Sequence, residues 1–252
     1  MNKPKTSVRI PPDAVIFDMD GVLIDSNPFH LQIWREFLIR QGVSFDPDKL
    51  PAQIFGQRDD KALRMFLGAD LSEQQVQDWS EELEANFREA FRPHARALPG
   101  VNALIEECRE AGLPMAVASS AMKKNVDFVV EALKLAPCFQ SVVSGDEVRR
   151  PKPDPEIYLL AAEHLAASPP HTVAFEDSFV GIEAVVRAGM KCVAIASTFS
   201  VQQLREETRA HCVVGSFEEL SLARLRQLFD QLSGDSETRI PDPRSGIPDP
   251  KS

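Results

Sequence analysis

Short apolar runs recur along the chain and alternate with stretches of helical periodicity. The runs predicted as strands are Ala14–Phe17, Met115–Ala118, Ser141–Val143, Val173–Phe175, Cys192–Ile195 and Cys212–Val214. They are nearly continuous in apolar character, which is typical of strands covered on both faces of a parallel sheet. Helical spacing lies between them, for instance over Val101–Ala111 and over Gly181–Ala188, where Gly189 follows as a helix stop. This alternation predicts an α/β fold with a doubly wound parallel sheet and right-handed crossovers.

One interval between the predicted strands lacks any strand pattern. Apolar positions there follow helical spacing, first over residues 29–37 and again over residues 76–87. Ligands bind open α/β sheets beyond the carboxyl ends of the strands, so a helical insertion after the first strand would cover the site as a lid. The predicted organisation is an α/β core (14–27 and 93–232), a helical cap (28–92) and a disordered tail (233–252) rich in Pro, Asp and Ser.

Composition narrows the possible partners and compartments. The 252 residues carry a net charge of -10, which argues against binding to nucleic acid or to an anionic membrane surface. No apolar run is long enough to span a bilayer, and the N-terminus MNKPKTSVRIPPD lacks the apolar segment of a signal peptide. The four scattered cysteines, without C-x-x-C spacing, predict free thiols in a reducing compartment. A cytoplasmic location is therefore the default expectation.

The first predicted strand runs directly into carboxylates, in the stretch AVIFDMDGVLIDS. Asp18 and Asp20 are two residues apart, so on an extended chain their side chains start on the same face, and Gly21 permits a sharp turn. The dipeptide Asp20-Gly21 is also a hairpin signal, although a helical region follows it instead of a pairing strand. Two carboxylates this close repel unless a proton or a cation lies between them. A hard cation such as Mg²⁺ would fit, and the combination indicates phosphoryl chemistry.

Three later segments supply residue types that such chemistry requires. In AVASS, Ser119 and Ser120 precede a helical stretch, either as a phosphate cradle or as a helix N-cap. In RRPKPDP, Lys152 lies between two prolines and would hold a phosphoryl oxygen or be an ordinary surface lysine. In AFEDS, Glu176 and Asp177 would complete a metal site or stabilise a helix dipole. Each signal is weak alone, whereas their order at successive strand ends is specific.

In this order, over residues 14–228, the chain resembles the haloacid dehalogenase-like (HAD) phosphotransferase superfamily in its helical-cap branch. The catalytic and metal-binding positions that the resemblance implies are Asp18, Asp20, Ser119, Lys152, Glu176 and Asp177. It implies that Asp18 is the nucleophile that becomes an aspartyl phosphate and that Asp20 is the general acid and base. It also implies Mg²⁺ held by Asp18, the Asp20 carbonyl, Asp177 and Glu176, with Glu176 acting directly or through a water. Ser119 and Lys152 would contact phosphoryl oxygens.

The cap is expected to choose the substrate. In FHLQIW, His30 is similar to the first cap helix of β-phosphoglucomutase and lies near the hinge. The segment IFGQRDDKAL resembles the substrate loop of that mutase but is one residue shorter, which weakens a mutase assignment. Arg58 in this loop is a candidate contact for an anionic or polyhydroxy substrate because its planar fork suits phosphate and carboxylate. Ser120 is a third candidate substrate contact.

These observations predict a Mg²⁺-dependent phosphatase, expected to be a monomer, that acts on a small phosphorylated metabolite such as a sugar phosphate. A sugar phosphomutase is the first alternative, because an aspartyl phosphate can also pass its phosphoryl group to a sugar hydroxyl. A non-catalytic phospho-switch resembling receiver domains is the second. In receiver domains, however, the acceptor aspartate follows the third strand and no helical insertion follows the first.

Overall fold

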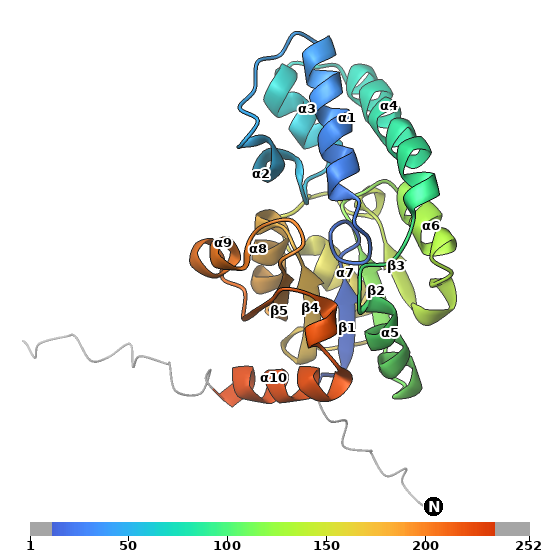
Figure 1. Cartoon of the computed structure of the whole chain (residues 1–252), viewed down its shortest axis with the longest axis vertical. Helices are drawn as coiled ribbons and strands as arrows, with labels where there is room; N and C mark the ends of the chain where they lie inside the picture. The colour runs from blue at the N-terminus through green and yellow to red at the C-terminus, as the bar shows by residue number, and fades with distance from the viewer. Residues whose placement is uncertain (1–11, 235–252) are drawn as a thin grey trace, which may run out of the picture.

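The structure, a computed structural model, describes residues 12–234 and contains a six-stranded sheet (Figure 1). Every strand pair is parallel, and the strand order is β3-β2-β1-β4-β5-β6. The strands are β1 (Ala14–Phe17), β2 (Met115–Ala118), β3 (Ser141–Val143), β4 (Thr172–Glu176), β5 (Lys191–Ile195) and β6 (Cys212–Val214). The predicted doubly wound sheet is confirmed, and each predicted strand lies within one residue of an observed one.

Helices cover both faces of the sheet because successive strand residues point in opposite directions. Val15 and Phe17 pack into one apolar cluster with α5, α6 and α10, while Ala14 and Ile16 pack into another with α7, α8 and α9. The helices of the core are α5 (Val101–Glu110), α6 (Lys123–Ala132), α7 (Glu156–His164), α8 (Phe179–Arg187), α9 (Val201–Glu207) and α10 (Leu222–Gly234). With both faces buried, the strands need no polar alternation, which explains their apolar runs.

Four helices inserted between β1 and β2 lie above the carboxyl ends of the strands (Figure 1). They are α1 (Asn27–Arg40), α2 (Leu50–Ile54), α3 (Asp59–Leu67) and α4 (Glu73–Phe91). They bury a separate apolar cluster that includes Trp34, Phe37 and Leu83. The predicted helical insertion is therefore confirmed, and the limits 28–92 for the cap stay a prediction.

Short 3₁₀ helices complete the described chain: η1 (Arg92–His94), η2 (Ala136–Cys138), η3 (Gly145–Glu147), η4 (Pro169–His171) and η5 (Phe217–Glu219). Gly189 has φ +75° after α8, which confirms the predicted left-handed helix stop. Helix α10 runs to Gly234, two residues into the predicted tail, and the remaining tail residues, 235–252, lie outside the described residues, as do residues 1–11.

The four cysteines are free thiols, as predicted. Within residues 12–234, none of the helices has the length and apolarity needed to cross a membrane.

Candidate active site

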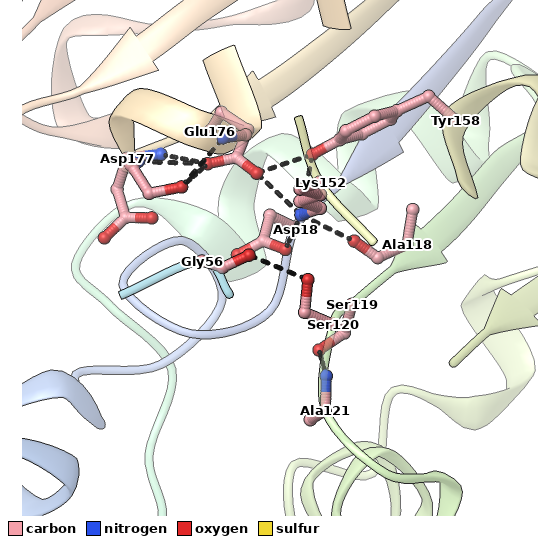
Figure 2. Close-up of polar contacts among 12 residues, drawn as sticks. Asp18, Gly56, Ala118, Ser119, Ser120, Ala121, Lys152, Tyr158, Glu176 and Asp177 are labelled. Carbon is pink, nitrogen blue, oxygen red and sulfur yellow. Dashed lines mark hydrogen bonds and ion pairs between the residues drawn. The ribbon is translucent and has the colours of Figure 1, made fainter. Parts of the chain in front are cut away.

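Five of the six predicted catalytic and metal-binding residues meet at the carboxyl edge of the sheet: Asp18, Ser119, Lys152, Glu176 and Asp177 (Figure 2). Asp18 follows β1, Glu176 ends β4, and Asp177 follows Glu176. A carboxylate oxygen from each of the three lies within 4.8 Å of the others. Ser119 follows β2, and Lys152 comes from the loop before α7. Parallel neighbouring strands end at the same edge, so residues more than a hundred positions apart meet there.

Lys152 is the positive centre of this group. Its side chain is 1% exposed, and its Nζ donates to Asp18 Oδ1 at 2.6 Å and to Glu176 Oε1 at 2.7 Å. Further contacts join Nζ to the hydroxyl oxygen of Tyr158 at 3.1 Å and to the carbonyl of Ala118 at 3.4 Å. Burial acts to lower the pKa of Lys152, but the charges of the two carboxylates raise it above its ordinary value. The side chain is therefore an ammonium throughout the neutral pH range.

Glu176 is surrounded by donors. Its Oε1 accepts from Lys152 and from the Tyr158 hydroxyl, both at 2.7 Å. Its Oε2 accepts from the backbone N–H of Asp177 and from the backbone N–H and hydroxyl of Ser178, at 2.9 to 3.0 Å. Burial acts to raise the pKa of Glu176, yet the charge and hydrogen bond of Lys152 hold it below its ordinary value. Glu176 thus orients the lysine and the loop after β4, and its predicted metal contact stays a prediction.

Asp18 and Asp177 keep oxygen atoms that no protein donor reaches. Asp177 Oδ2 accepts from Asn27 Nδ2 at 2.8 Å and from the Thr198 hydroxyl. Within residues 12–234, no hydrogen-bond donor contacts Asp177 Oδ1 or Asp18 Oδ2. Burial, opposed by Lys152, raises the pKa of Asp18 to about 8. Burial and the charges of Glu176 and Asp18 raise the pKa of Asp177 well above its ordinary value. One ammonium faces three buried carboxylates, and this oxygen-rich donor set fits a hard divalent cation.

Gly21 allows the turn after β1 to pass directly over Asp177. Its φ is +74°, and a Cβ there would collide with Asp177 Oδ2 and with Asn27 Nδ2. We expect Gly21→Ala to lower the free energy of unfolding by more than Gly42→Ala, which is the matched control. Gly42 has φ +70° with nothing within 4 Å of a Cβ, so its substitution isolates the backbone cost of about 1–2 kcal/mol. Urea unfolding measures both, and equal losses would show that the turn does not press on Asp177.

The carboxylate of Asp20 lies apart from the three-carboxylate group. Its Oδ1 accepts from the Ser26 hydroxyl at 2.6 Å and lies 3.3 Å from His30 Nε2. Burial acts to raise the pKa of Asp20, but the hydrogen bonds from His30 and Ser26 hold it below its ordinary value. The His30 ring stacks on Phe87 with centroids 4.0 Å apart, so its orientation is set by the cap. Both Asp18 and Asp20 nevertheless line the same cavity.

That cavity, of about 440 Å³, lies between the core and the cap. The predicted site residues along its wall are Asp18, Asp20, His30, Arg58, Ser119 and Ser120. The Arg58 guanidinium is engaged by protein: it donates to both carboxylate oxygens of Asp60, at 3.0 and 2.5 Å, and to the Val148 carbonyl at 3.1 Å. The predicted substrate contacts of Arg58, His30 and Ser120 stay predictions.

The two serines after β2 differ from the sequence expectation in one respect. Helix α6 begins at Lys123 and its N-cap residue is Met122, so neither serine lies at the helix start. The serine N-cap is therefore wrong, and the contact of Ser119 with a phosphate stays a prediction. Ser119 is buried, and its Oγ accepts from the Ala121 N–H at 3.1 Å. The Ser120 hydroxyl donates to the Gly56 carbonyl at 2.8 Å and so joins the core to the cap (Figure 2).

A family model described as haloacid dehalogenase-like hydrolase matches residues 15–195. The chain belongs to this family. A Thermotoga maritima relative named phosphorylated carbohydrates phosphatase is 32% identical over 179 residues, which cover 71% of this chain and 82% of the relative. The family and its relatives named as phosphatases confirm the predicted resemblance and the predicted enzyme class, a phosphoric monoester hydrolase.

Two solved structures are similar in fold to this hydrolase. The structure of β-phosphoglucomutase from Clostridium difficile has a TM-score of 0.79 and 23% identity, covering 88% of this chain and 99% of that one; this likeness shows the fold. CbbY from Rhodobacter sphaeroides in complex with phosphate has a TM-score of 0.69 and 28% identity, covering 84% of this chain and 97% of that one.

Sequence reasoning missed the residues that hold the site of this hydrolase in place. Tyr158 contacts both Glu176 and Lys152, while Asn27 and Thr198 both donate to Asp177. Asn27 and Asp177 are 150 positions apart in the chain. Contacts at such separations leave no local periodicity in the sequence. The one local signal for Asn27 is that it is a polar residue at the start of α1.

Proposed function

We propose that this hydrolase is a Mg²⁺-dependent phosphatase that cleaves a small phosphorylated metabolite, of the sugar phosphate class, through an aspartyl phosphate on Asp18. The observation that carries the proposal is the meeting of Asp18, Lys152 and Asp177 beside a cavity of metabolite size. The Thermotoga maritima relative, named as a phosphatase of phosphorylated carbohydrates, supports the substrate class. We further propose that the enzyme works as a cytoplasmic monomer on small molecules alone.

The residues divide the proposed reaction among them. Asp18 Oδ2, which no donor within residues 12–234 contacts, attacks phosphorus, and the bond between phosphorus and the ester oxygen breaks. Asp20 faces the same cavity; it takes up a proton as the anionic phosphate ester binds beside it and raises its pKa, and it gives that proton to the leaving oxygen. A water molecule, deprotonated by Asp20, then attacks phosphorus and restores the Asp18 carboxylate. Lys152 holds the Asp18 side chain, and with Ser119 it contacts the phosphoryl oxygens.

Asp18, Asp177 and the Asp20 carbonyl are the groups that would hold Mg²⁺. When bound, this cation offsets the negative charge of the phosphoryl group and of the carboxylates. Asn27 and Thr198 occupy Asp177 Oδ2 and so leave Oδ1 for the cation. Ser26 and His30 orient Asp20.

Removal of divalent cations is expected to abolish phosphate release, and added Mg²⁺ to restore it. The measurement is free phosphate released from a panel of sugar phosphates, with and without a chelator. Mg²⁺ at a hundredfold excess over its dissociation constant stabilises a folded protein by about 2.7 kcal/mol, which raises the melting temperature of a chain of this size by about 5–10 °C. Asp177→Asn is expected to lose this shift. An unchanged rate in the presence of chelator would contradict the metal requirement.

The same panel separates the phosphatase from the alternative mutase. A phosphatase releases free phosphate from a hexose phosphate, whereas a mutase converts one hexose phosphate isomer into another with no net release. The receiver-like alternative fits the structure poorly, since Asp18 follows the first strand and four helices are inserted after it. Isomer conversion in place of phosphate release would establish the mutase.

A further inference from the structure

The cap side of the cavity combines apolar residues such as Trp34 and Phe55 with polar residues on two helices. Of the α4 residues that line the cavity, four are polar and lie three or four positions apart, so they share one face of the helix: Glu73, Gln77, Ser80 and Glu84. Asp59 and Asp60 add the first turn of α3. We call these six polar residues the cavity roof. Glu73 and Gln77 are exposed, whereas Ser80 and Glu84 are buried, so the exposure of the roof to solvent falls along α4 from Glu73 to Glu84.

The cavity is rich in carboxylates and poor in available cations. Of the residues lining it, seven are aspartates or glutamates and Arg58 is the one arginine or lysine. Asp60 and backbone carbonyls already take the guanidinium hydrogens of Arg58. Glu73 is paired outside the cavity with Arg64 at 2.5 Å. His30 also lines the cavity, and its Nε2 lies 3.3 Å from Asp20 Oδ1. A second phosphate or a carboxylate on the substrate would therefore meet mainly negative charge at the roof.

Asp59 and Glu84 form the central feature of the roof, since both line the cavity and the charge of Asp59 acts to raise the pKa of Glu84. Glu84 is 5% exposed and also accepts from Asn125 Nδ2. The other end of that amide, Asn125 Oδ1, accepts from Arg88 at 2.5 Å. The charge of Arg88 thus reaches Glu84 through a neutral amide. Burial raises the pKa of Asp59 to about 6, although the charge of His30 opposes this, and burial together with the charge of Asp59 raises the pKa of Glu84 well above its ordinary value.

Ser80 provides an independent sign that the roof contacts a ligand. Its side chain lines the cavity one helical turn from Glu84 and is 4% exposed. Among the residues that the structure describes, none makes a hydrogen bond to its hydroxyl. A hydroxyl that opens into a cavity and has no protein partner is free to pair with the molecule that fills the cavity.

We propose, on the basis of the proposed phosphatase function, that the roof selects a phosphate monoester whose alcohol part carries a protonated amino group. The ammonium binds between Asp59 and Glu84, a neighbouring hydroxyl of the substrate pairs with Ser80, and the substrate has no second phosphate or carboxylate. The ammonium supplies a positive charge beside these two carboxyl groups, which have no direct partner among the lysines and arginines that line the cavity. Charge-assisted hydrogen bonds of this kind are stronger than neutral ones and discriminate between an amine and a hydroxyl.

The test compares kcat/KM within matched pairs of substrates, using the Mg²⁺-loaded enzyme and phosphate release. Glucosamine 6-phosphate is paired with glucose 6-phosphate, and galactosamine 1-phosphate with galactose 1-phosphate. We expect the amino member of at least one pair to be favoured by about 10- to 100-fold. Glucose 6-phosphate should in turn be favoured over 6-phosphogluconate, which adds a carboxylate.

Variants of the roof show whether the pair is responsible. Glu84→Gln is expected to reduce the ratio of amino to hydroxyl substrate by about tenfold, and Asp59→Asn serves as a second variant if Glu84→Gln does not fold. Glu89→Gln, an exposed position on the same helix, is the matched control and should leave the ratio unchanged. Because each ratio is taken within one protein, a general loss of activity does not affect it.

The outcomes separate this inference from the proposed function. Absence of phosphate release from every ester would overturn the phosphatase itself. Hydrolysis with no preference for either amino substrate, and with ratios that the roof variants leave unaltered, would overturn the inference while the phosphatase stands. A preference that falls in Glu84→Gln but persists in Glu89→Gln supports it.

Discussion

Replacement of Asp18 by asparagine is expected to lower kcat for phosphate release by about 10⁴-fold or more, in line with the loss of a nucleophile in other hydrolases. Asparagine has nearly the same shape and can still accept a hydrogen bond from Lys152 through its side-chain oxygen. It cannot, however, form the covalent phosphate ester. The substitution also removes one of three buried carboxylates that face a single ammonium. We therefore expect the variant to fold and to unfold at a temperature no lower than the original chain.

The control for this experiment lies in the same segment of the chain. Asp25 belongs to the same acidic stretch, but its side chain is exposed. Asp25→Asn should retain activity within about twofold, because exposed substitutions outside a site change little. Initial rates with a chromogenic phosphate ester and Mg²⁺ measure both variants. If Asp18→Asn released phosphate as fast as Asp25→Asn, Asp18 would not be the nucleophile.

Loss of Lys152 is expected to affect both activity and stability. The ammonium is buried and contacts Asp18 and Glu176, so Lys152→Ala leaves two carboxylates without a charge partner. Breaking a buried ion pair by removing one partner costs about 3–5 kcal/mol. The positions of Asp18 and the phosphoryl group would also loosen, and we expect kcat/KM to fall by about 10²–10³-fold, the loss seen when one preorganised donor is removed from a site.

Urea unfolding and phosphate release together test this expectation. Lys61→Ala is the matched control, because Lys61 is an exposed lysine on α3 and its loss should change stability by no more than about 0.5 kcal/mol. Lys152→Arg should fail to restore activity, because a planar guanidinium is larger than the compact ammonium of Lys152 and does not fit the same buried space. A stable and active Lys152→Ala enzyme would contradict the role of Lys152 as the internal cation of the site.

The direction in which Asp18 and Glu176 point, toward Lys152, follows from strand geometry. Ala14 and Ile16 of β1 face α7, and so by alternation does Asp18, since the backbone N–H of Asp18 still pairs with the Phe175 carbonyl of β4 at 3.0 Å. Ala174 faces the same side, and so does Glu176 two residues later. Both acids therefore point toward the face from which Lys152 and Tyr158 approach. That alternate residues of each strand share a face follows from the predicted strands. The contact of Asp18 and Glu176 with Lys152 does not.

The sequence by itself determined the sheet, the helical insertion and the identity of the acidic group. Buried parallel strands must be apolar along their whole length, so their positions are visible in the chain, and polar residues that follow directly after them must lie at one edge of the sheet. This local rule is enough to place Asp18 and the Glu176–Asp177 pair at the same edge of the sheet.

Only the tertiary structure decided which partner each side chain takes. It assigned the guanidinium of Arg58 to Asp60 and to backbone carbonyls, and it placed Asp59 of α3 and Glu84 of α4 on the wall of the same cavity. It also placed Asn27 against Asp177, 150 residues away. Hydrogen bonds and ion pairs depend on distance and direction in space, and helix and strand periodicity carries no record of which helix face will meet which loop.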